Sequence, residues 1–278
     1  MATARTPIPH ETSGLAAPSA AQPVPGDSYV QSFARGLAVI RSFSAQSPRQ
    51  TLSEVAGRAQ LTRAGARRIL LTLQTLGYVK SDGKLFELTP RILDLGFAYL
   101  SSLPLWNLAE PVMQELVGQI KESCSAAVLN GTDIVYVLRV PTHKIMSISL
   151  GVGSRLPAYC TSMGRMLLSA LPPDAMMNVL QASDRTARTC FTVTDVDELA
   201  AKIAQVRNQG WSLVDQELEE GLVSMAAPIT DRSGHTIAAI NISGQANRTS
   251  AKVMQETMLP RLLAAAQSIS SQLTIQRS

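Results

Sequence analysis

Three arginines lie within six residues of the sequence. Arg63, Arg67 and Arg68 belong to the stretch "QLTRAGARRILLTLQTLGY", whose apolar residues recur at helical spacing. Arg63 and Arg67 share one side of such a helix because they are four residues apart, and Arg68 lies at the edge of that side. Guanidinium groups pair with phosphates and with guanine edges, and the sequence leaves open which of these they would contact. A solvated helix face would explain the same pattern.

Two further stretches gather polar side chains. In "RLPAYCTSMGRMLLSAL", a predicted helix begins near Thr161, and its free backbone amides would favour an anion such as a small carboxylate. A well-capped helix with a buried cysteine would fit equally. In "DQELEEGL", acidic and amide side chains precede a glycine between two predicted strands. They would either line a pocket or form a solvated loop.

The elements around the arginines have strong local signals. Residues 28–43 have the apolar spacing of an amphipathic helix. Thr51 and Glu54 have the spacing of a capping box, Thr62 suits the N-cap of the arginine helix, and Gly77 suits its end. The following stretch "YVKSDGKLFELT" is typical of a hairpin turning at Asp82-Gly83, with Lys84 near its tip. Three helices and a hairpin predict a winged helix-turn-helix over residues 28–89. Its third helix, which carries the three arginines, would enter a DNA major groove.

The charge distribution supports this prediction. The chain has 278 residues and a net charge of +4. Residues 28–104 contain ten Lys and Arg but four Asp and Glu, a net +6, whereas residues 105–278 and residues 1–27 each carry −1. A basic segment joined to a nearly neutral one is the electrostatic pattern of a nucleic-acid-binding module attached to a second domain.

The rest of the chain predicts an α+β fold. Residues 90–104 form a predicted linker helix, whose apolar face would either join two copies of the chain or pack on its own domain. Residues 105–273 contain in order a helix capped at Asn107, three strands including "IMSISL", several helices, three strands and a final helix kinked near Pro260. This order predicts one antiparallel sheet with helices packed on it.

Composition argues against several other classes. The sequence lacks a run of about 18 apolar residues, so we expect no membrane span. The Pro-, Ala- and Ser-rich segment 1–27 predicts a disordered tail rather than a signal peptide. Three widely spaced cysteines favour a reducing cytoplasm. No cofactor or metal motif is evident. The alternative function is an enzyme with Cys160 as nucleophile and His143 or His235 as base, but no further catalytic motif surrounds these residues.

The motifs quoted above, together with "SFARGLAVIRSF" and "GWSLVDQELEEGLVSMAAPITD", resemble the IclR family of bacterial transcription regulators over residues 28–273. The segments "LPAYCTSMGR" and "DQELEEGL" are similar to those of the PcaR/PcaU/PobR branch. That branch controls catabolism of protocatechuate, 4-hydroxybenzoate and related compounds. The resemblance implies a winged helix-turn-helix, a linker helix and a GAF-like effector domain. It also implies homodimers or dimers of dimers on double-stranded promoter DNA, and a small carboxylate effector of the aromatic-acid or β-ketoadipate type.

The residue patterns predict the DNA-binding residues, and the resemblance implies the effector-binding residues. The predicted DNA-binding residues are Arg35, Arg63, Arg67, Arg68 and Lys84. The predicted effector-binding residues are Asn130, Tyr159, Cys160, Thr161, Ser162, Gly164, Asp215, Glu217, Ser224, Asn241 and Ser243.

Overall fold

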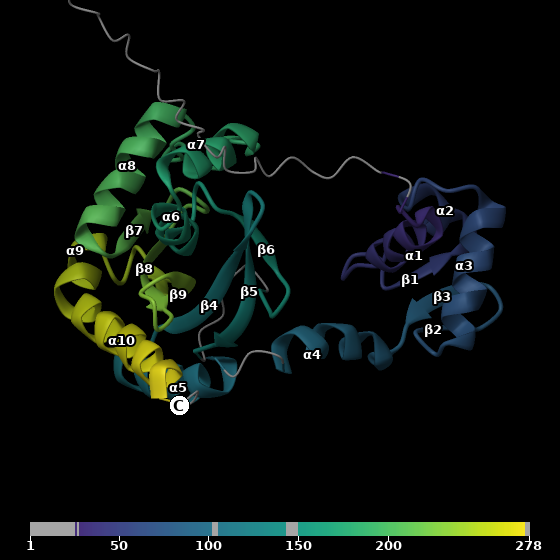
Figure 1. The fold of residues 1–278 in the computed structure, drawn as a ribbon, viewed down its shortest axis with the longest axis horizontal. Coiled ribbons are helices and arrows are strands. Elements are labelled where there is room, and N and C mark those ends of the chain that lie inside the picture. Colours follow the sequence, from purple (N-terminus) through teal and green to yellow (C-terminus); the bar gives the residue numbers. More distant parts are fainter. Residues whose placement is uncertain (1–25, 27, 102–104, 143–149, 276–278) are drawn as a thin grey trace, which may run out of the picture. The chain divides into compact units, whose positions relative to one another are not determined.

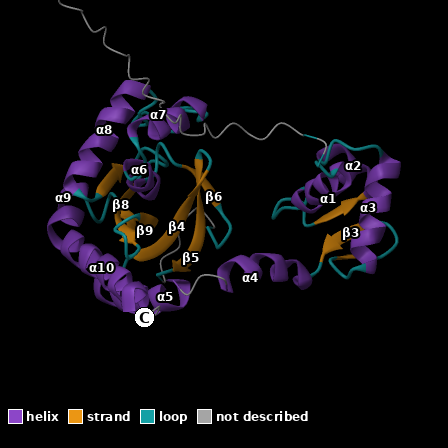
Figure 2. Ribbon diagram, viewed as in Figure 1, coloured by secondary structure: helices purple, strands orange, loops and turns teal. Residues whose placement is uncertain are grey.

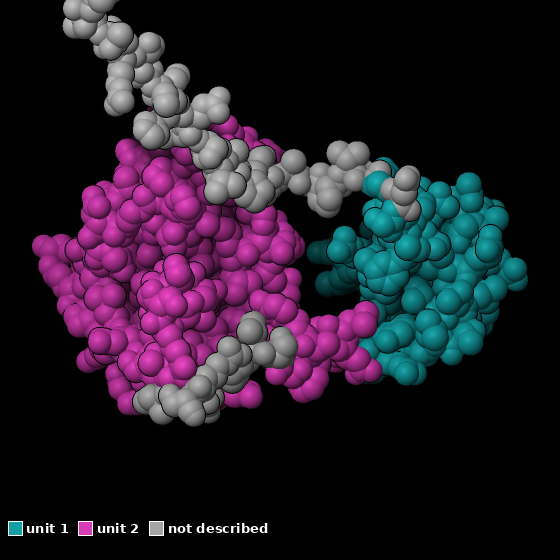
Figure 3. Space-filling view, in the orientation of Figure 1, with its two compact units in different colours: residues 1–92 teal, residues 93–278 magenta. Residues whose placement is uncertain are grey.

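The chain forms two compact units, which divide between Ile92 and Leu93 (Figure 3). The computed structural model describes residues 26, 28–101, 105–142 and 150–275. The segment 1–27 that we predicted as a disordered tail lies, apart from residue 26, outside the described residues.

The first unit is a winged helix-turn-helix, as predicted. Its strands form an antiparallel sheet in the order β1-β3-β2. We did not predict β1, a three-residue strand without the alternating pattern that marks longer strands. The elements are α1 (Gln31–Arg41), β1 (Arg49–Thr51), α2 (Leu52–Arg58), α3 (Arg63–Thr75), β2 (Val79–Ser81) and β3 (Leu85–Leu88).

Capping geometry confirms the predicted starts of α2 and α3, whereas α1 is shorter at both ends than the helix predicted over residues 28–43. The Thr51 hydroxyl accepts from the Glu54 amide at 3.3 Å, and the Glu54 carboxylate accepts from the Thr51 amide at 2.7 Å. Thr62 caps α3 by accepting from the Gly65 amide at 3.1 Å. Gly77 follows α3 with φ +80, a conformation that glycine adopts without steric cost. Thr62 and Gly77 therefore mark where the arginine helix α3 starts and stops.

The segment predicted as a linker helix begins as a 3-10 turn (η1, Pro90–Ile92) and continues as α4 (Leu93–Ser101). No residue of α4 is buried. Its exposed apolar side chains include Leu93, Leu95 and Phe97.

The second unit contains one six-stranded antiparallel sheet in the order β6-β5-β4-β9-β8-β7, which confirms the predicted fold class (Figure 1). Its strands are β4 (Ser123–Asn130), β5 (Asp133–Val140), β6 (Arg155–Pro157), β7 (Ser212–Asp215), β8 (Leu222–Thr230) and β9 (Thr236–Gln245). Its helices are α5 (Leu105–Ile120), α6 (Ser162–Ser169), α7 (Pro173–Ala182), α8 (Val196–Gln209), α9 (Ala251–Val253), a π-helical turn (Met254–Met258) and α10 (Leu259–Ile275).

Details of this unit differ from our predictions. The strand expected in "IMSISL" lies outside the described residues except for Leu150, whereas β6 forms in a stretch where we predicted no strand. The predicted N-cap at Asn107 is wrong, because α5 begins at Leu105. Leu105 and Trp106 are buried, so packing extends the helix beyond its local capping signal. The π-helical turn ends two residues before Pro260, near the predicted kink.

Helices cover both faces of the sheet (Figure 2). α5 and α10 pack on one face, where the core includes Met113, Met225 and Ile240. α6 packs on the other face, where the core includes Tyr159, Met163 and Leu168. Side chains alternate between the two faces along each strand, so the face under α6 receives the odd-numbered residues of β9 and the even-numbered residues of β8.

Candidate functional site: a basic helix and a polar pocket

Helix α3 exposes a basic side while burying its apolar side. Ala66, Leu70 and Leu73 are buried in the core of the first unit, and Arg63 and Arg67 are exposed. The helix carries no acidic residue. The predicted DNA-binding residues Arg35, Arg68 and Lys84 are exposed as well.

The described acidic groups of the first unit are all occupied by local partners. Glu54 belongs to the capping box, where the Thr51 amide holds the pKa of its carboxyl below the usual range. The Leu85 amide does the same for the pKa of Asp82, which also pairs with Arg49 at 2.6 Å. A hydrogen bond from Lys80 lowers the pKa of Glu87. These carboxylates remain ionised and bound at neutral pH.

The basic groups of α3 are therefore not neutralised within the unit. Arg63, Arg67, Arg68 and Lys84 form no ion pair with any residue that the structure describes. Free guanidinium and ammonium groups on an exposed helix and on the neighbouring wing form a surface suited to phosphates and base edges.

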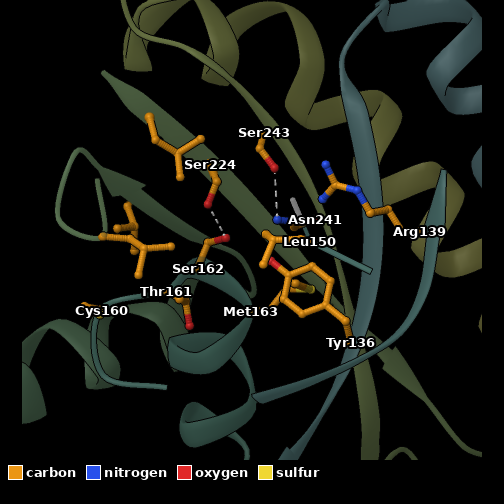
Figure 4. A pocket seen from close by; sticks show the side chains of 13 residues that line it. Tyr136, Arg139, Leu150, Cys160, Thr161, Ser162, Met163, Ser224, Asn241 and Ser243 are labelled. Atoms are coloured by element: carbon orange, nitrogen blue, oxygen red, sulfur yellow. Dashed lines mark hydrogen bonds between the residues drawn. The ribbon is translucent and has the colours of Figure 1, made fainter. Parts of the chain in front are cut away.

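A pocket lies in the second unit between the sheet and the N-terminal end of α6 (Figure 4). About 520 Å³ of space within it is free of protein atoms, part of this open to solvent. Its wall consists of Tyr136, Arg139, Leu150, Cys160, Thr161, Ser162, Met163, Val214, Leu218, Leu222, Ser224, Asn241 and Ser243.

Strand register explains why polar side chains from distant parts of the chain meet here. Residues directly opposite each other in an antiparallel sheet present their side chains on the same face. Ser243 of β9 is paired with Ser224 of β8, and Asn241 lies two residues from Ser243 on the same face. The Ser162 and Ser224 hydroxyls are 2.6 Å apart, so this face is the one that meets α6.

A β-bulge adds two further residues to the pocket. Tyr136 and Arg139 are three residues apart in β5 and would point to opposite faces of a regular strand. In the pairing of β4 with β5, Ala126 lies opposite Leu138 and the next residue, Ala127, lies opposite Tyr136. Val137 therefore has no partner in β4. The extra residue restores Tyr136 and Arg139 to one face, as bulges beside functional sites often do.

Among the described residues of this wall, Arg139 is the one that carries a charge. It forms no ion pair and no hydrogen bond through its side chain with any described residue, and its guanidinium points from β5 toward Asn241 and Ser243 (Figure 4). Burial raises the pKa of Tyr136 to about 12, so its phenol stays neutral at physiological pH. An unpaired guanidinium with neutral hydroxyl and amide donors around it suits a carboxylate ligand.

Six of the predicted effector-binding residues lie together on the pocket wall. They are Cys160, Thr161, Ser162, Ser224, Asn241 and Ser243. Thr161 also caps α6 by accepting from the Gly164 amide at 3.2 Å.

Three other predicted residues have structural contacts away from the wall. The Tyr159 hydroxyl donates to the Thr186 carbonyl at 2.6 Å. Gly164 lets α6 approach the preceding loop, because a Cβ there would lie 2.1 Å from the Ala158 carbonyl oxygen. Asn130 lies in the β4–β5 turn, where its side-chain oxygen accepts from Arg155 at 3.0 Å.

Asp215 and Glu217 line a different groove, beside α8. Glu217 is buried and forms an ion pair with Arg165 of α6 at 2.6 Å, so its carboxylate is already bound within the protein. Of the segment "DQELEEGL", only Leu218 and Leu222 reach the polar pocket.

Arg139 and Tyr136 are not among the residues that the sequence predicted for this site. Both lie in "DIVYVLRV", which we predicted correctly as a strand. A single basic residue within a half-buried apolar strand is unusual enough to have signalled a ligand contact. The bulge that turns Arg139 into the pocket has no comparable local signal.

The structure gives little support to Cys160 as a nucleophile. Burial raises the pKa of its thiol, which opposes formation of the reactive thiolate. His235 is in the exposed β8–β9 turn near Asp231, and His143 lies outside the described residues. Within the described part of the chain, no group of three or more His, Cys, Asp or Glu side chains is arranged to hold a metal ion. No described helix combines the length and apolarity that a membrane span requires.

Comparisons with known proteins agree with both halves of this description. The IclR helix-turn-helix domain model matches residues 32–83, and the model of the C-terminal domain of bacterial transcriptional regulator IclR matches residues 97–271. The chain is 45% identical to the Pca regulon regulatory protein of Pseudomonas putida, over 88% of this chain and 84% of that protein.

Solved structures extend this likeness. A crystal structure from Rhodococcus sp. RHA1 is 51% identical and superimposes with a TM-score of 0.80, over 88% of this chain and 98% of the other. An IclR homolog from Microbacterium hydrocarbonoxydans, complexed with 4-hydroxybenzoate, is 25% identical with a TM-score of 0.78, over 87% and 98%. The matched models together cover most of the chain, and the protein therefore belongs to the IclR family of bacterial transcriptional regulators.

Proposed function

We propose that this protein regulates genes for the catabolism of aromatic acids, binding double-stranded promoter DNA through α3 and the wing and binding a small aromatic carboxylate in the polar pocket. The name of the Pseudomonas relative and the 4-hydroxybenzoate bound to the Microbacterium homolog support this class of effector. The observation that carries the proposal is the unpaired Arg139 guanidinium on the pocket wall.

The arrangement of the wall defines the ligand. One full positive charge favours a single carboxylate at Arg139. Leu150, Met163 and Val214 supply apolar surface for a ring. The hydroxyl and amide groups of Ser162, Ser224 and Asn241 supply partners for further polar substituents. An aromatic acid with a ring hydroxyl matches all three features.

The DNA-binding form is a homodimer in this proposal. Leu93 and Phe97, one helical turn apart on α4, are 70% and 67% exposed, and a second copy would remove this apolar surface from water. Two copies of α3 would then read the two halves of a palindromic site. Ligand binding would act by shifting the population between arrangements that differ in DNA affinity.

Calorimetric titration tests the ligand class. We expect the full-length protein to bind benzoate and 4-hydroxybenzoate and to bind the neutral amide 4-hydroxybenzamide much more weakly. Arg139→Gln removes the charge and should abolish this preference for the acid. Arg232→Gln removes one charge from the exposed β8–β9 turn and serves as the control. Equal affinity for acid and amide, or an Arg139→Gln variant that still prefers the acid, would contradict the proposal.

A further inference from the structure

The hydroxyl of Ser125 in β4 is buried and has no hydrogen-bond partner in the described part of the chain. The residue is 1% exposed, and its side-chain oxygen contacts no donor or acceptor among the described residues. An unsatisfied buried hydroxyl is costly, and native structures usually contain one only where a water, an ion or a ligand completes it. Ser125 therefore indicates a missing partner on this side of the sheet.

The strand register places Ser125 in the polar pocket region. It is paired with Arg139 on one neighbouring strand and with Asn241 on the other, so all three side chains lie on the face beneath α6. Arg139 and Asn241 both line the pocket. The Ser125 hydroxyl thus lies between two pocket residues. Ser125 is not among the effector-binding residues that the family resemblance implied.

Its neighbour Asn241 is already held in one orientation. The Asn241 side-chain oxygen accepts from the Ser125 amide at 3.1 Å, and its side-chain nitrogen donates to the Ser243 hydroxyl at 3.3 Å. Asn241 uses its side-chain oxygen and nitrogen within the protein, whereas the Ser125 hydroxyl and the Arg139 guanidinium donate no hydrogen to any residue that the structure describes. These two neighbouring donors are free for the same acceptor.

The other end of the pocket has a different chemistry. The Ser162 and Ser224 hydroxyls bond to each other, and either can be the donor. Such a pair retains one hydroxyl hydrogen and several lone pairs, so it can both donate to and accept from a ligand hydroxyl. Figure 4 shows this pair and Arg139 on opposite sides of the pocket, with Asn241 between them.

We propose that Ser125 is a ligand-binding residue whose hydroxyl donates to the carboxylate held by Arg139, so that the effector lies with its carboxylate against the sheet and its ring hydroxyl at the Ser162–Ser224 pair. This inference rests on the proposed function. It reverses the orientation expected from the α6 dipole, because a full guanidinium charge attracts a carboxylate more strongly than the partial charge at a helix N-terminus.

Ser212 provides a matched control. Its hydroxyl is also fully buried without a partner, and it lies on the same face of the sheet, in β7 opposite Ala226, which is itself opposite Asn241. Neither serine is one of the wall residues, but Ser125 lies directly between the wall residues Arg139 and Asn241, whereas Ser212 is two strands away from Asn241. Replacing either serine by alanine removes one orphaned hydroxyl, so the two variants share any structural consequence and differ in their distance from the ligand.

The experiment is calorimetric titration of the full-length wild type, Ser125→Ala and Ser212→Ala with benzoate and 4-hydroxybenzoate. A lost hydrogen bond to a charged group should weaken binding of both acids to Ser125→Ala by roughly 10- to 100-fold. Ser212→Ala should bind both acids like the wild type. In contrast, Ser224→Ala should lower the preference for 4-hydroxybenzoate over benzoate, since only the former carries the ring hydroxyl.

The outcomes separate the two proposals. A wild type that binds neither acid would overturn the proposed function and this inference together. A wild type that binds the acids, with Ser125→Ala binding them equally well, would overturn the role of Ser125 alone. Equal losses in Ser125→Ala and Ser212→Ala would also overturn it, because the effect would then be structural. A Ser125→Ala variant that loses only the preference for 4-hydroxybenzoate would overturn the proposed orientation.

Discussion

Arg165 of α6 and Glu217 of the β7–β8 connection form a buried bidentate ion pair, with nitrogen–oxygen distances of 2.7 and 2.6 Å. The Val193 amide also donates to Glu217 at 3.0 Å, and the Arg165 Nε donates to the Tyr159 carbonyl at 2.8 Å. The pair ties the helix that carries Ser162 to the loop that carries Leu218. It thereby fixes two walls of the pocket without contacting its interior.

Glu217→Ala should destabilise the second unit by about 3–5 kcal/mol, because it leaves the Arg165 charge buried without a partner. Denaturant unfolding of the full chain would measure this change. The double variant Arg165→Met/Glu217→Leu should recover most of the loss, since no charge then remains buried. A single variant as stable as the wild type would show that water reaches the pair.

Gly164→Ala should destabilise the protein by more than about 1–3 kcal/mol, because the added Cβ would overlap the Ala158 carbonyl oxygen at 2.1 Å. Gly118→Ala in α5 is the matched control. An added Cβ meets nothing within 4 Å there, and alanine favours the helix, so a gain of about 0.4–1 kcal/mol is expected. If Gly164→Ala and Gly118→Ala shift the melting temperature in the same direction, the close approach of α6 to the Ala158 carbonyl at Gly164 is contradicted.

Arg67→Ala should weaken binding to a DNA duplex that the wild type selects from a random-sequence pool. Arg67 is exposed and unpaired among the described residues, so the loss of roughly 1–3 kcal/mol comes from DNA contacts rather than from folding. Fluorescence anisotropy at several salt concentrations would measure it. A smaller salt slope than in the wild type would identify a phosphate contact. Arg232→Ala removes one positive charge from the second unit and serves as the control. An equal loss of DNA affinity in this variant would indicate only a general charge effect.

The three cysteines should differ in reactivity. Cys190 is exposed, whereas Cys124 and Cys160 are buried, and burial raises the pKa of both buried thiols. At pH 8, iodoacetamide should therefore modify one thiol per folded chain and three after unfolding, which mass spectrometry would count. Rapid modification of Cys160 in the folded protein would contradict its burial and revive the nucleophile hypothesis.

The same pKa shifts predict loss of stability in alkali. A thiol whose pKa is raised by folding contributes stability below its unfolded pKa, and this contribution falls as pH rises toward the folded pKa. Unfolded thiols ionise near about pH 8.5, so the melting temperature should decline above roughly pH 9. Cys124→Ala should reduce the steepness of this decline.

The sequence by itself determined the elements whose signals are local. The Thr51–Glu54 capping box, the Thr62 and Thr161 caps and the Gly77 helix end each involve residues within a few positions of one another, and the structure confirms them. The basic charge of the first unit was equally evident. These features made the winged helix-turn-helix predictable, and the order of the elements predicted in residues 105–273 indicated the antiparallel sheet.

Tertiary structure alone decided which polar groups meet. Ser125 and Asn241 are 116 residues apart and are joined by strand pairing, and Arg139 reaches the pocket only because of the bulge in β5. Glu217, which the family resemblance placed among the effector-binding residues, forms an ion pair with Arg165. Such contacts depend on register and packing between distant segments. A shift of one residue turns a side chain to the opposite face of the sheet, and no local pattern encodes that choice.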